Sequence, residues 1–408
     1  MQKHLLRWFG ITLGIATLAA LMIGCSDVTT HSSLNGNTVT INIKTGDGQA
    51  IDPAYLAFQD GNHAWRKITL NGNGHYTFQV TNIAKKYGVA IVDRQNNTMP
   101  NVIYATTNEL ADIPYTLLNN STSGFSISGN VTGSNGERTI VCCGGKVGVA
   151  PGDAAYNLTN VGDGNHLLLA CRMPNSPNIP DSYVLKNISV GSGDTGDCNI
   201  NYTNDSITPR NLTVTKPSGT VEGSEWLWLA DNNLFIRVGE NSGGITDTYA
   251  ALPTTAPTDG ILYDYALTWN NGSSYETYRR TPSNVDLSSI SLPTMAAPTI
   301  DNDHTTCSWS KFNAAKLYTV QMNGIARQAI YLTAGWLGAS ASYTLALPNF
   351  SALSSDGWNS NWAPSTITSV VVAAITLNAP TENYFKARMG GEYYDGYTIS
   401  KICYGNTP

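Results

Sequence analysis

The feature that most restricts the fold of this chain is the alternation of short strand-forming runs with turn-forming clusters. Thr38–Ile43 and His75–Val80 alternate apolar and polar residues with a period of two, and Gly, Asn, Asp and Pro clusters follow such runs. Tyr87–Val92 is predicted to be a buried strand. No segment beyond residue 25 keeps a helical period, so the chain is predicted to be all-β. Only Thr107–Leu110 and Asn313–Lys316 favour short helices.

The composition agrees with a globular β protein. Charged residues make up only 13% of the 408 residues, which argues against long exposed helices and coiled coils. The 21 Tyr, 9 Trp and 8 Phe supply ample surface to bury, which argues against disorder. The formal net charge of -6 offers no basic footprint, so nucleic acid is not a predicted partner.

Turn-rich gaps divide the exported part of the chain into four units, each long enough to bury its own core. Each unit has the many short strands that are typical of a β-sandwich. No strong sequence repeat relates the units to one another. The predicted boundaries are residues 36–119, 122–206, 207–298 and 299–408.

The first 24 residues have the plan of a secretory signal. Lys3 and Arg7 precede an apolar run, and Trp8–Ile23 is shorter than the ~20 residues that span a bilayer. The segment Leu21-Met22-Ile23-Gly24-Cys25 resembles the lipobox of bacterial prolipoproteins, with Met22 where that family prefers Leu. The resemblance implies cleavage before Cys25 and acylation of its thiol, with palmitate or similar chains.

This resemblance carries the expected location of the protein. Residues 25–35 are predicted to be the lipidated cysteine and a flexible tether. The acyl chains on Cys25 make the membrane a predicted partner, and Ser26 after the cysteine implies transport to the outer membrane. The alternative is an ordinary secreted protein in which Cys25 has no such role.

Six cysteines follow Cys25, and an even number in an exported chain favours disulfides. Cys307 and Cys403 lie near the two ends of the last unit and are candidate partners. The remaining four all lie in the second unit, where they allow three connectivities.

Those four cysteines include two neighbours in sequence, Cys142 and Cys143. Consecutive strand residues point to opposite faces, so we predict different partners for them, one Cys171 and the other Cys198. Zinc is the alternative, but the spacing lacks the close cysteine pairs of structural zinc sites, and no metal is predicted.

Two units resemble known sandwich families. Ser128–Gly133 and the later Tyr156–Leu169 resemble the carboxypeptidase-regulatory or prealbumin-like sandwich, which implies a module without an active site of its own. Trp309 and Ala314–Val320 resemble the start of a fibronectin type III repeat, and Trp309 is expected to share a strand face with Cys307. The predicted fold class is all-β: several consecutive immunoglobulin-like or fibronectin III-like β-sandwich domains after a signal peptide and flexible tether.

No catalytic or cofactor motif occurs in the chain. The acidic clusters Asp194–Asp197 and Asp301–His304 supply too few oxygens for calcium and are predicted to form Asx turns. We therefore predict no catalytic residues, no cofactor and no enzyme activity. A hydrolase whose active site assembles from distant residues is a further hypothesis.

Aromatic residues carry the main indication of binding. Sugar rings stack on aromatic faces and hydrogen-bond to amides, so exposed Trp beside Asn favours a glycan site; the alternative is that these rings fill sandwich cores. The candidate binding residues are Trp226, Trp228, Trp358, Asn359, Asn361 and Trp362.

Taken together, the sequence predicts a lipid-anchored bacterial cell-envelope protein of non-catalytic modules for adhesion, scaffolding or display. A surface carbohydrate-binding protein is the first alternative. The predicted partners are the membrane and either a glycan or an envelope protein.

Overall fold

The computed structural model describes residues 36–406, apart from short internal segments. For many residues of the strands between 222 and 290, and of the strand after 398, it describes the backbone alone. The internal segments outside the described residues are 46–48, 94–99, 118–123, 176–178, 192–196, 204–206, 208, 216–221, 232–233, 240–245, 253–261, 271–273, 283–286, 292–297, 302–304, 325–327, 351–352, 354–357, 359–366 and 390–398.

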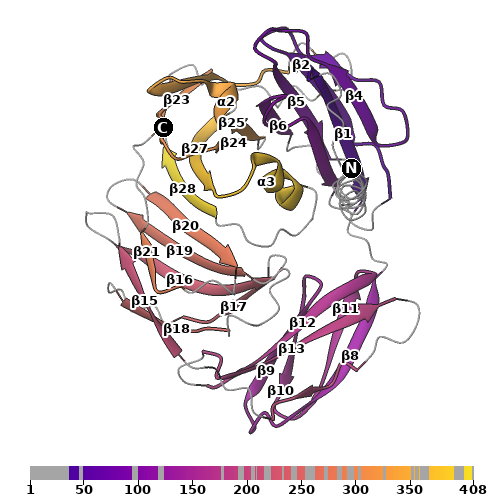
Figure 1. Ribbon diagram of the computed structural model, residues 1–408, viewed down its shortest axis with the longest axis vertical. Helices are drawn as coiled ribbons and strands as arrows, with labels where there is room; N and C mark the ends of the chain where they lie inside the picture. Colours follow the sequence, from indigo (N-terminus) through magenta and orange to yellow (C-terminus); the bar gives the residue numbers. More distant parts are fainter. Residues whose placement is uncertain are drawn as a thin grey trace, which may run out of the picture. The chain divides into compact units, whose positions relative to one another are not determined.

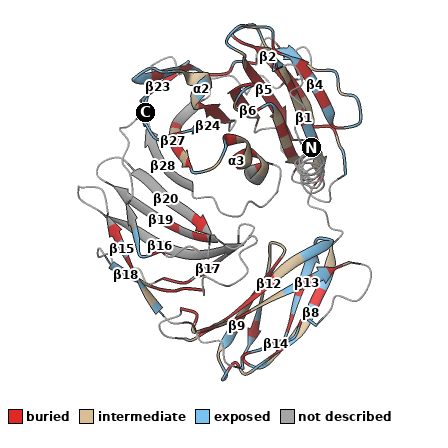
Figure 2. Cartoon of the chain, viewed as in Figure 1, coloured by how far each residue is buried: buried red, intermediate tan, exposed pale blue. Residues whose placement is uncertain are grey.

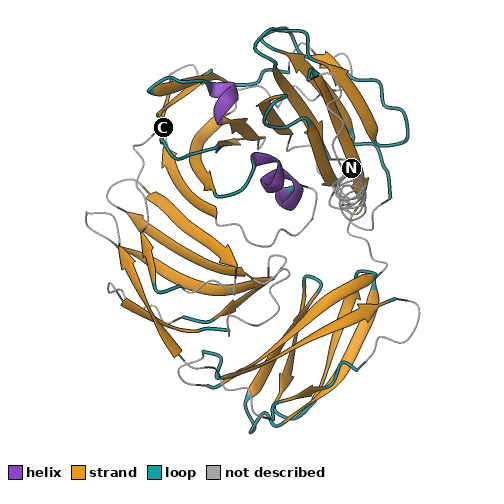
Figure 3. Cartoon of the chain, in the orientation of Figure 1, coloured by secondary structure: helices purple, strands orange, loops and turns teal. Residues whose placement is uncertain are grey.

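Nearly all of the regular secondary structure in the described chain is strand, which confirms the predicted all-β class (Figure 3). Two short helices are described, α2 (Ala334–Leu337) and α3 (Thr381–Arg388). The prediction of helices at Thr107–Leu110 and Asn313–Lys316 is wrong, because both segments are turns. Helical hydrogen bonds over four residues are too few to fix a helix without support from tertiary packing.

The first unit is a sandwich of a three-stranded and a four-stranded sheet. Apolar residues alternate along its first strand, so Val39, Ile41 and Ile43 all face the core. The sheet orders are β4-β1-β7 and β3-β2-β5-β6. The strands are β1 (Thr38–Thr45), β2 (Tyr55–Asp60), β3 (Arg66–Lys67), β4 (His75–Gln79), β5 (Lys86–Val92), β6 (Asn101–Thr106) and β7 (Asp112–Leu117).

The second unit has the same strand order as the first, with sheets β11-β8-β14 and β10-β9-β12-β13. As in the first unit, the first strand, β8, lies in the middle of its sheet. It pairs antiparallel with the unit's fourth strand, β11, and in parallel with its last strand, β14. The strands are β8 (Phe125–Thr132), β9 (Arg138–Cys143), β10 (Lys146–Pro151), β11 (Ala155–Val161), β12 (Gly164–Met173), β13 (Ser182–Val190) and β14 (Ile200–Asn201).

The third unit repeats this order once more, with β18-β15-β21 in one sheet and β17-β16-β19-β20 in the other. Three successive units therefore share one topology although their sequences show no strong repeat, because period-two burial can be met by many apolar residues. The strands are β15 (Pro209–Thr215), β16 (Glu222–Asp231), β17 (Leu234–Arg237), β18 (Thr246–Ala250), β19 (Leu262–Asn270), β20 (Ser274–Pro282) and β21 (Ser289–Ser291).

The fourth unit has a different order, with three strands β22-β23-β26 and four strands β25-β24-β27-β28. Cys307 and Trp309 alternate along β23 and are both buried, which confirms that they share a face. The strands are β22 (Thr299–Ile300), β23 (Thr306–Ser310), β24 (Leu317–Gly324), β25 (Gln328–Thr333), β26 (Ser342–Ala346), β27 (Ile367–Leu377) and β28 (Ile399–Asn406).

The four-stranded sheets of three units join edge to edge into one sheet of twelve strands (Figure 1). Strand β20 pairs antiparallel with β28, and β25 pairs in parallel with β6. These pairings satisfy backbone groups at edges that would otherwise be open.

The first and fourth units also share buried side chains. Figure 2 shows buried residues along β5 of the first unit and β27 of the fourth. Val102 and Tyr104 of the first unit lie in one cluster with Trp309 and Ile330 of the fourth. The sequence predicts a separate core for each unit, whereas these two units are packed as one. Among the described residues, no helix is both long and apolar enough to cross a bilayer.

Candidate binding surface

The structure buries Trp358, which the sequence predicts to be an exposed binding residue. Only 2% of Trp358 is exposed, and its ring stacks on Phe350 at 4.9 Å between ring centroids. Tyr55 packs against the same indole at 5.6 Å. An indole buries a large apolar area, so this one is used to fill the shared core of the first and fourth units.

The other predicted binding residues are not placed. Asn359, Asn361 and Trp362 lie outside the described residues. Trp226 and Trp228 lie on β16, whose backbone pairs with β19 and β17, but their side chains are not described. The antiparallel pairing of β16 with β17 places Trp228 opposite Arg237.

Of the acidic cluster Asp301–His304, the structure describes Asp301, whose side chain binds the start of the next strand. The carboxylate of Asp301 accepts the backbone N–H groups of Thr305 and Thr306 at 2.6 and 2.9 Å, and the Thr305 hydroxyl at 2.7 Å. These hydrogen bonds, first those from Thr306 and Thr305, lower the pKa of Asp301 to about 2. Of the other cluster, Asp197 caps the Asn199 N–H at 2.9 Å and pairs with Lys186 at 3.0 Å.

A different set of aromatic side chains lies partly exposed where the first and fourth units meet. Trp336 of α2 packs on Tyr104 of β6 at 4.6 Å, and Tyr104 packs on Trp65 at 6.0 Å. Trp65 in turn meets the edge of Phe350 at 5.1 Å. We call Trp65, Tyr104 and Trp336 the aromatic surface; Trp65 and Trp336 are half-buried, and Tyr104 lies beneath them.

A glycine makes room for this surface. A side chain at Gly88 of β5 would come within 3.0 Å of both the Tyr104 and the Trp65 rings. Without a Cβ at Gly88, the two rings can lie close to the backbone of the sheet.

Polar groups border the aromatic surface. The Lys86 ammonium lies 5.5 Å from the centre of the Trp336 ring, which is a cation–π contact. Gln59 of β2 lies directly opposite Gly88 of β5. Its side-chain amide donates to the His63 carbonyl at 2.7 Å. Aromatic faces with a few fixed polar groups are typical of small-molecule sites.

Glu109 ties the two halves of this surface together. Its carboxylate accepts the Thr106 hydroxyl at 2.8 Å from the first unit and the Gly335 N–H at 2.7 Å from the fourth. The buried Thr333 hydroxyl donates to the same carboxylate. A side chain at Gly335 would collide with that carboxylate, so Gly335 is needed for this approach.

A groove on β3 and β4 lies on the other face of the first unit's four-stranded sheet. It encloses about 460 Å³ and is floored by Phe58 and Phe78, whose rings stack at 4.7 Å. Arg66 lies 5.9 Å from the Phe58 ring centre. The groove has cations and aromatic rings but no paired carboxylates for acid–base chemistry.

The sequence does not single out Trp65 or Trp336, because neither has an aromatic neighbour two residues away or an Asn-rich loop around it. The two residues both pack on Tyr104, and the β6–β25 pairing brings their units together there. Within the described residues, no group of three or more His, Cys, Asp or Glu side chains is placed to hold a metal.

Comparison with known proteins gives no family. No protein-family model matches the chain. No curated protein matches it either. One solved structure that aligns with it is described as the Bacteroides ovatus mixed-linkage glucan utilization locus (MLGUL) SGBP-B in complex with mixed-linkage heptasaccharide. That alignment has 10% identity, covers 90% of this chain and 95% of the other, and has a TM-score of 0.11, which is not a shared fold.

Proposed function

We propose that this chain is a lipid-anchored protein of the bacterial cell envelope that displays non-catalytic β-sandwich modules. The lipobox-like Leu21–Cys25 segment carries the proposal, since acyl chains on one thiol and amine make a stable anchor. The joined sheets support it, because modules linked by strand pairing hold a binding surface more rigidly than modules linked by a tether alone.

The anchor is tested by replacing the acylated residue. In a bacterial host, Cys25→Ala is expected to move the protein from the membrane pellet to the supernatant and to remove acyl mass from the mature chain. Ser26→Ala is the matched control, since it keeps the thiol and should stay in the pellet. An unmodified Cys25 by mass spectrometry, or unchanged retention of Cys25→Ala, would contradict the anchor.

Carbohydrate binding is the second candidate function, and the aromatic surface favours it. Two half-buried indoles with an ammonium and an amide nearby offer both stacking faces and hydrogen-bonding groups. A neutral or acidic polysaccharide fits this chemistry, because sugar C–H faces stack on rings while hydroxyls and carboxylates take polar contacts. The ligand would bind across the junction of the first and fourth units.

Glycan binding is tested with the mature chain that carries Cys25→Ala. On an array of plant, microbial and host glycans we expect binding that Trp65→Ala weakens about tenfold, which corresponds to the loss of about 1.4 kcal/mol of stacking. Arg66→Ala, at the groove on the other face, should leave the affinity unchanged. Silence across the whole array, or equal loss in both variants, would remove this candidate.

A further inference from the structure

The two adjacent cysteines of β9 face different cores. Cys143 lies in the core of the second sandwich with Leu168 and Ala170, whereas Cys142 lies in a separate cluster with Leu169. The register explains this, since Cys143 pairs with Leu168 and Cys142 with Leu169 on β12. The alternation of a strand therefore separates the two thiols across the sheet.

Cys198 lies on the same side as Cys143. Both are almost fully buried in the core between the two sheets of the second sandwich. The Tyr156 hydroxyl donates to the Cys198 carbonyl at 2.6 Å. Burial raises the pKa of Tyr156, and Cys198 and Cys143 raise it further.

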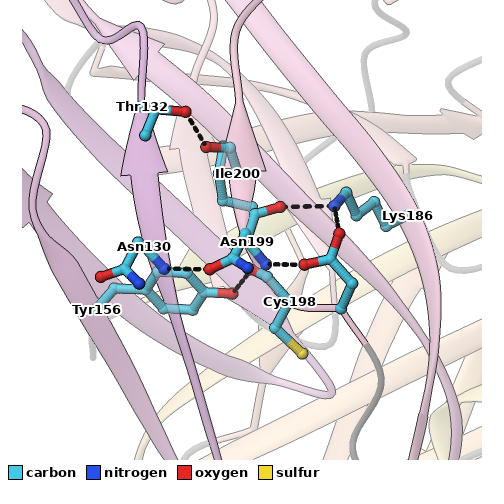
Figure 4. A network of polar contacts seen from close by, with 8 residues as sticks. Asn130, Thr132, Tyr156, Lys186, Cys198, Asn199 and Ile200 are labelled. Carbon is cyan, nitrogen blue, oxygen red and sulfur yellow. Dashed lines mark hydrogen bonds and ion pairs between the residues drawn. The ribbon is translucent and has the colours of Figure 1, made fainter.

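The main chain around Cys198 is held firmly (Figure 4). Asn199 accepts the Asn130 N–H at 2.9 Å, and Lys186 donates to the Asn199 carbonyl at 2.6 Å. A Cβ on Gly129 would collide with the Cys198 carbonyl, so this glycine lets the segment lie against β8. Figure 4 shows the Cys198 sulfur pointing away from these polar contacts.

Cys171 belongs to the opposite side. It pairs with Ile140 of β9, two residues from Cys142, and lies in the same cluster as Cys142. Burial, with Cys142 nearby, raises the pKa of the Cys171 thiol. Cys171 is therefore separated from Cys143 and Cys198 by the thickness of the sheet.

From this placement we infer that Cys143 and Cys198 form a disulfide that links the two sheets of the second sandwich, and that Cys142 and Cys171 take no part in it. The two thiols lose two protons and two electrons as the S–S bond forms. A disulfide donor of the oxidising compartment, or oxidised glutathione in vitro, accepts them and is reduced to two thiols. As the partner of Cys198, the structure selects Cys143 and not Cys142 or Cys171.

The test counts the free thiols of the mature Cys25→Ala chain after its incubation with oxidised glutathione. The protein is denatured without reductant, alkylated, digested with pepsin in acid and mapped by mass spectrometry. We expect unmodified Cys143 and Cys198, joined in one cross-linked peptide. Alkylation of either residue in this protein would overturn the inference.

Single variants give a second readout that does not depend on peptide mapping. Cys143→Ser should release Cys198, so the number of alkylated cysteines rises by one. If Cys143 were instead a free thiol, the same variant would lower the number by one. Cys171→Ser is the matched control, in which Cys143 and Cys198 must stay unmodified; release of Cys143 there would show the wrong connectivity.

Discussion

Replacing Glu109 with alanine is expected to lower the local free energy of unfolding at the junction of the first and fourth units by about 3 kcal/mol. The variant removes a carboxylate that three donors share, and it leaves the buried Thr333 hydroxyl without this acceptor. Hydrogen bonds to charged groups contribute about 1.5–3 kcal/mol each. In the variant, water can accept from the exposed Gly335 N–H and recover part of this energy.

Hydrogen exchange measures this effect locally, without assuming that the whole chain unfolds in one step. Amides of β6 and β25 should exchange on the order of a hundredfold faster in Glu109→Ala. Glu382→Ala is the control, because its partly buried ion pair with Lys386 joins two residues of α3 and not the two units, and such i,i+4 pairs contribute about 0.5 kcal/mol. Equal effects of the two variants would mean that Glu109 does not join the units.

Replacing Asp60 with alanine is expected to destabilise the first unit by about 3 kcal/mol. The buried Asp60 carboxylate accepts the Asn82 amide at 2.6 Å, the Thr81 N–H at 3.0 Å and the Thr81 hydroxyl. Asn82 also closes the turn before β5 by bonding both backbone groups of Lys86. Asp112→Ala removes a single exposed hydrogen bond to Asn42 and should cost less than about 1 kcal/mol.

Asp60 also makes the first unit sensitive to acid. Burial raises the pKa of Asp60, but the hydrogen bonds from Thr81 and Asn82 outweigh it and hold the pKa below its ordinary value. The stabilisation is therefore complete above the unfolded pKa of about 3.9 and is lost as the pH falls through the folded pKa. The stability difference between wild type and Asp60→Asn should be constant near neutrality and shrink in acid. A difference that grows in acid would contradict this assignment.

The strand content of the chain was predictable because it depends on a local repeat. The period of two at Thr38–Ile43 and His75–Val80 appears as β1 and β4, and the same period places Cys307 and Trp309 on one buried face. The two short helices of the described chain were missed. In α3 the apolar residues do not form a helical stripe, because Tyr384 and Phe385 are consecutive; α2 is a single turn.

The binding surface could not be predicted in the same way. Trp358 has the flanking residues of an exposed loop tryptophan, yet Phe350 and Tyr55 enclose it from two different units. Trp65 and Trp336 carry no local sign of function, and the pairing of β25 with β6 brings them together. Exposure depends on these distant neighbours and not on the residues beside a tryptophan in the chain.

The amino-acid order alone was enough for the all-β class and for the separation of Cys142 from Cys143, since both follow from the geometry of a single strand. It also contains the lipobox-like segment, whose role is still a prediction. Which strand edges join, which indoles stay in contact with water and which thiol faces Cys198 were decided by the tertiary structure. Those choices depend on pairings between segments far apart in the chain, and an open edge can accept many strands of similar pattern.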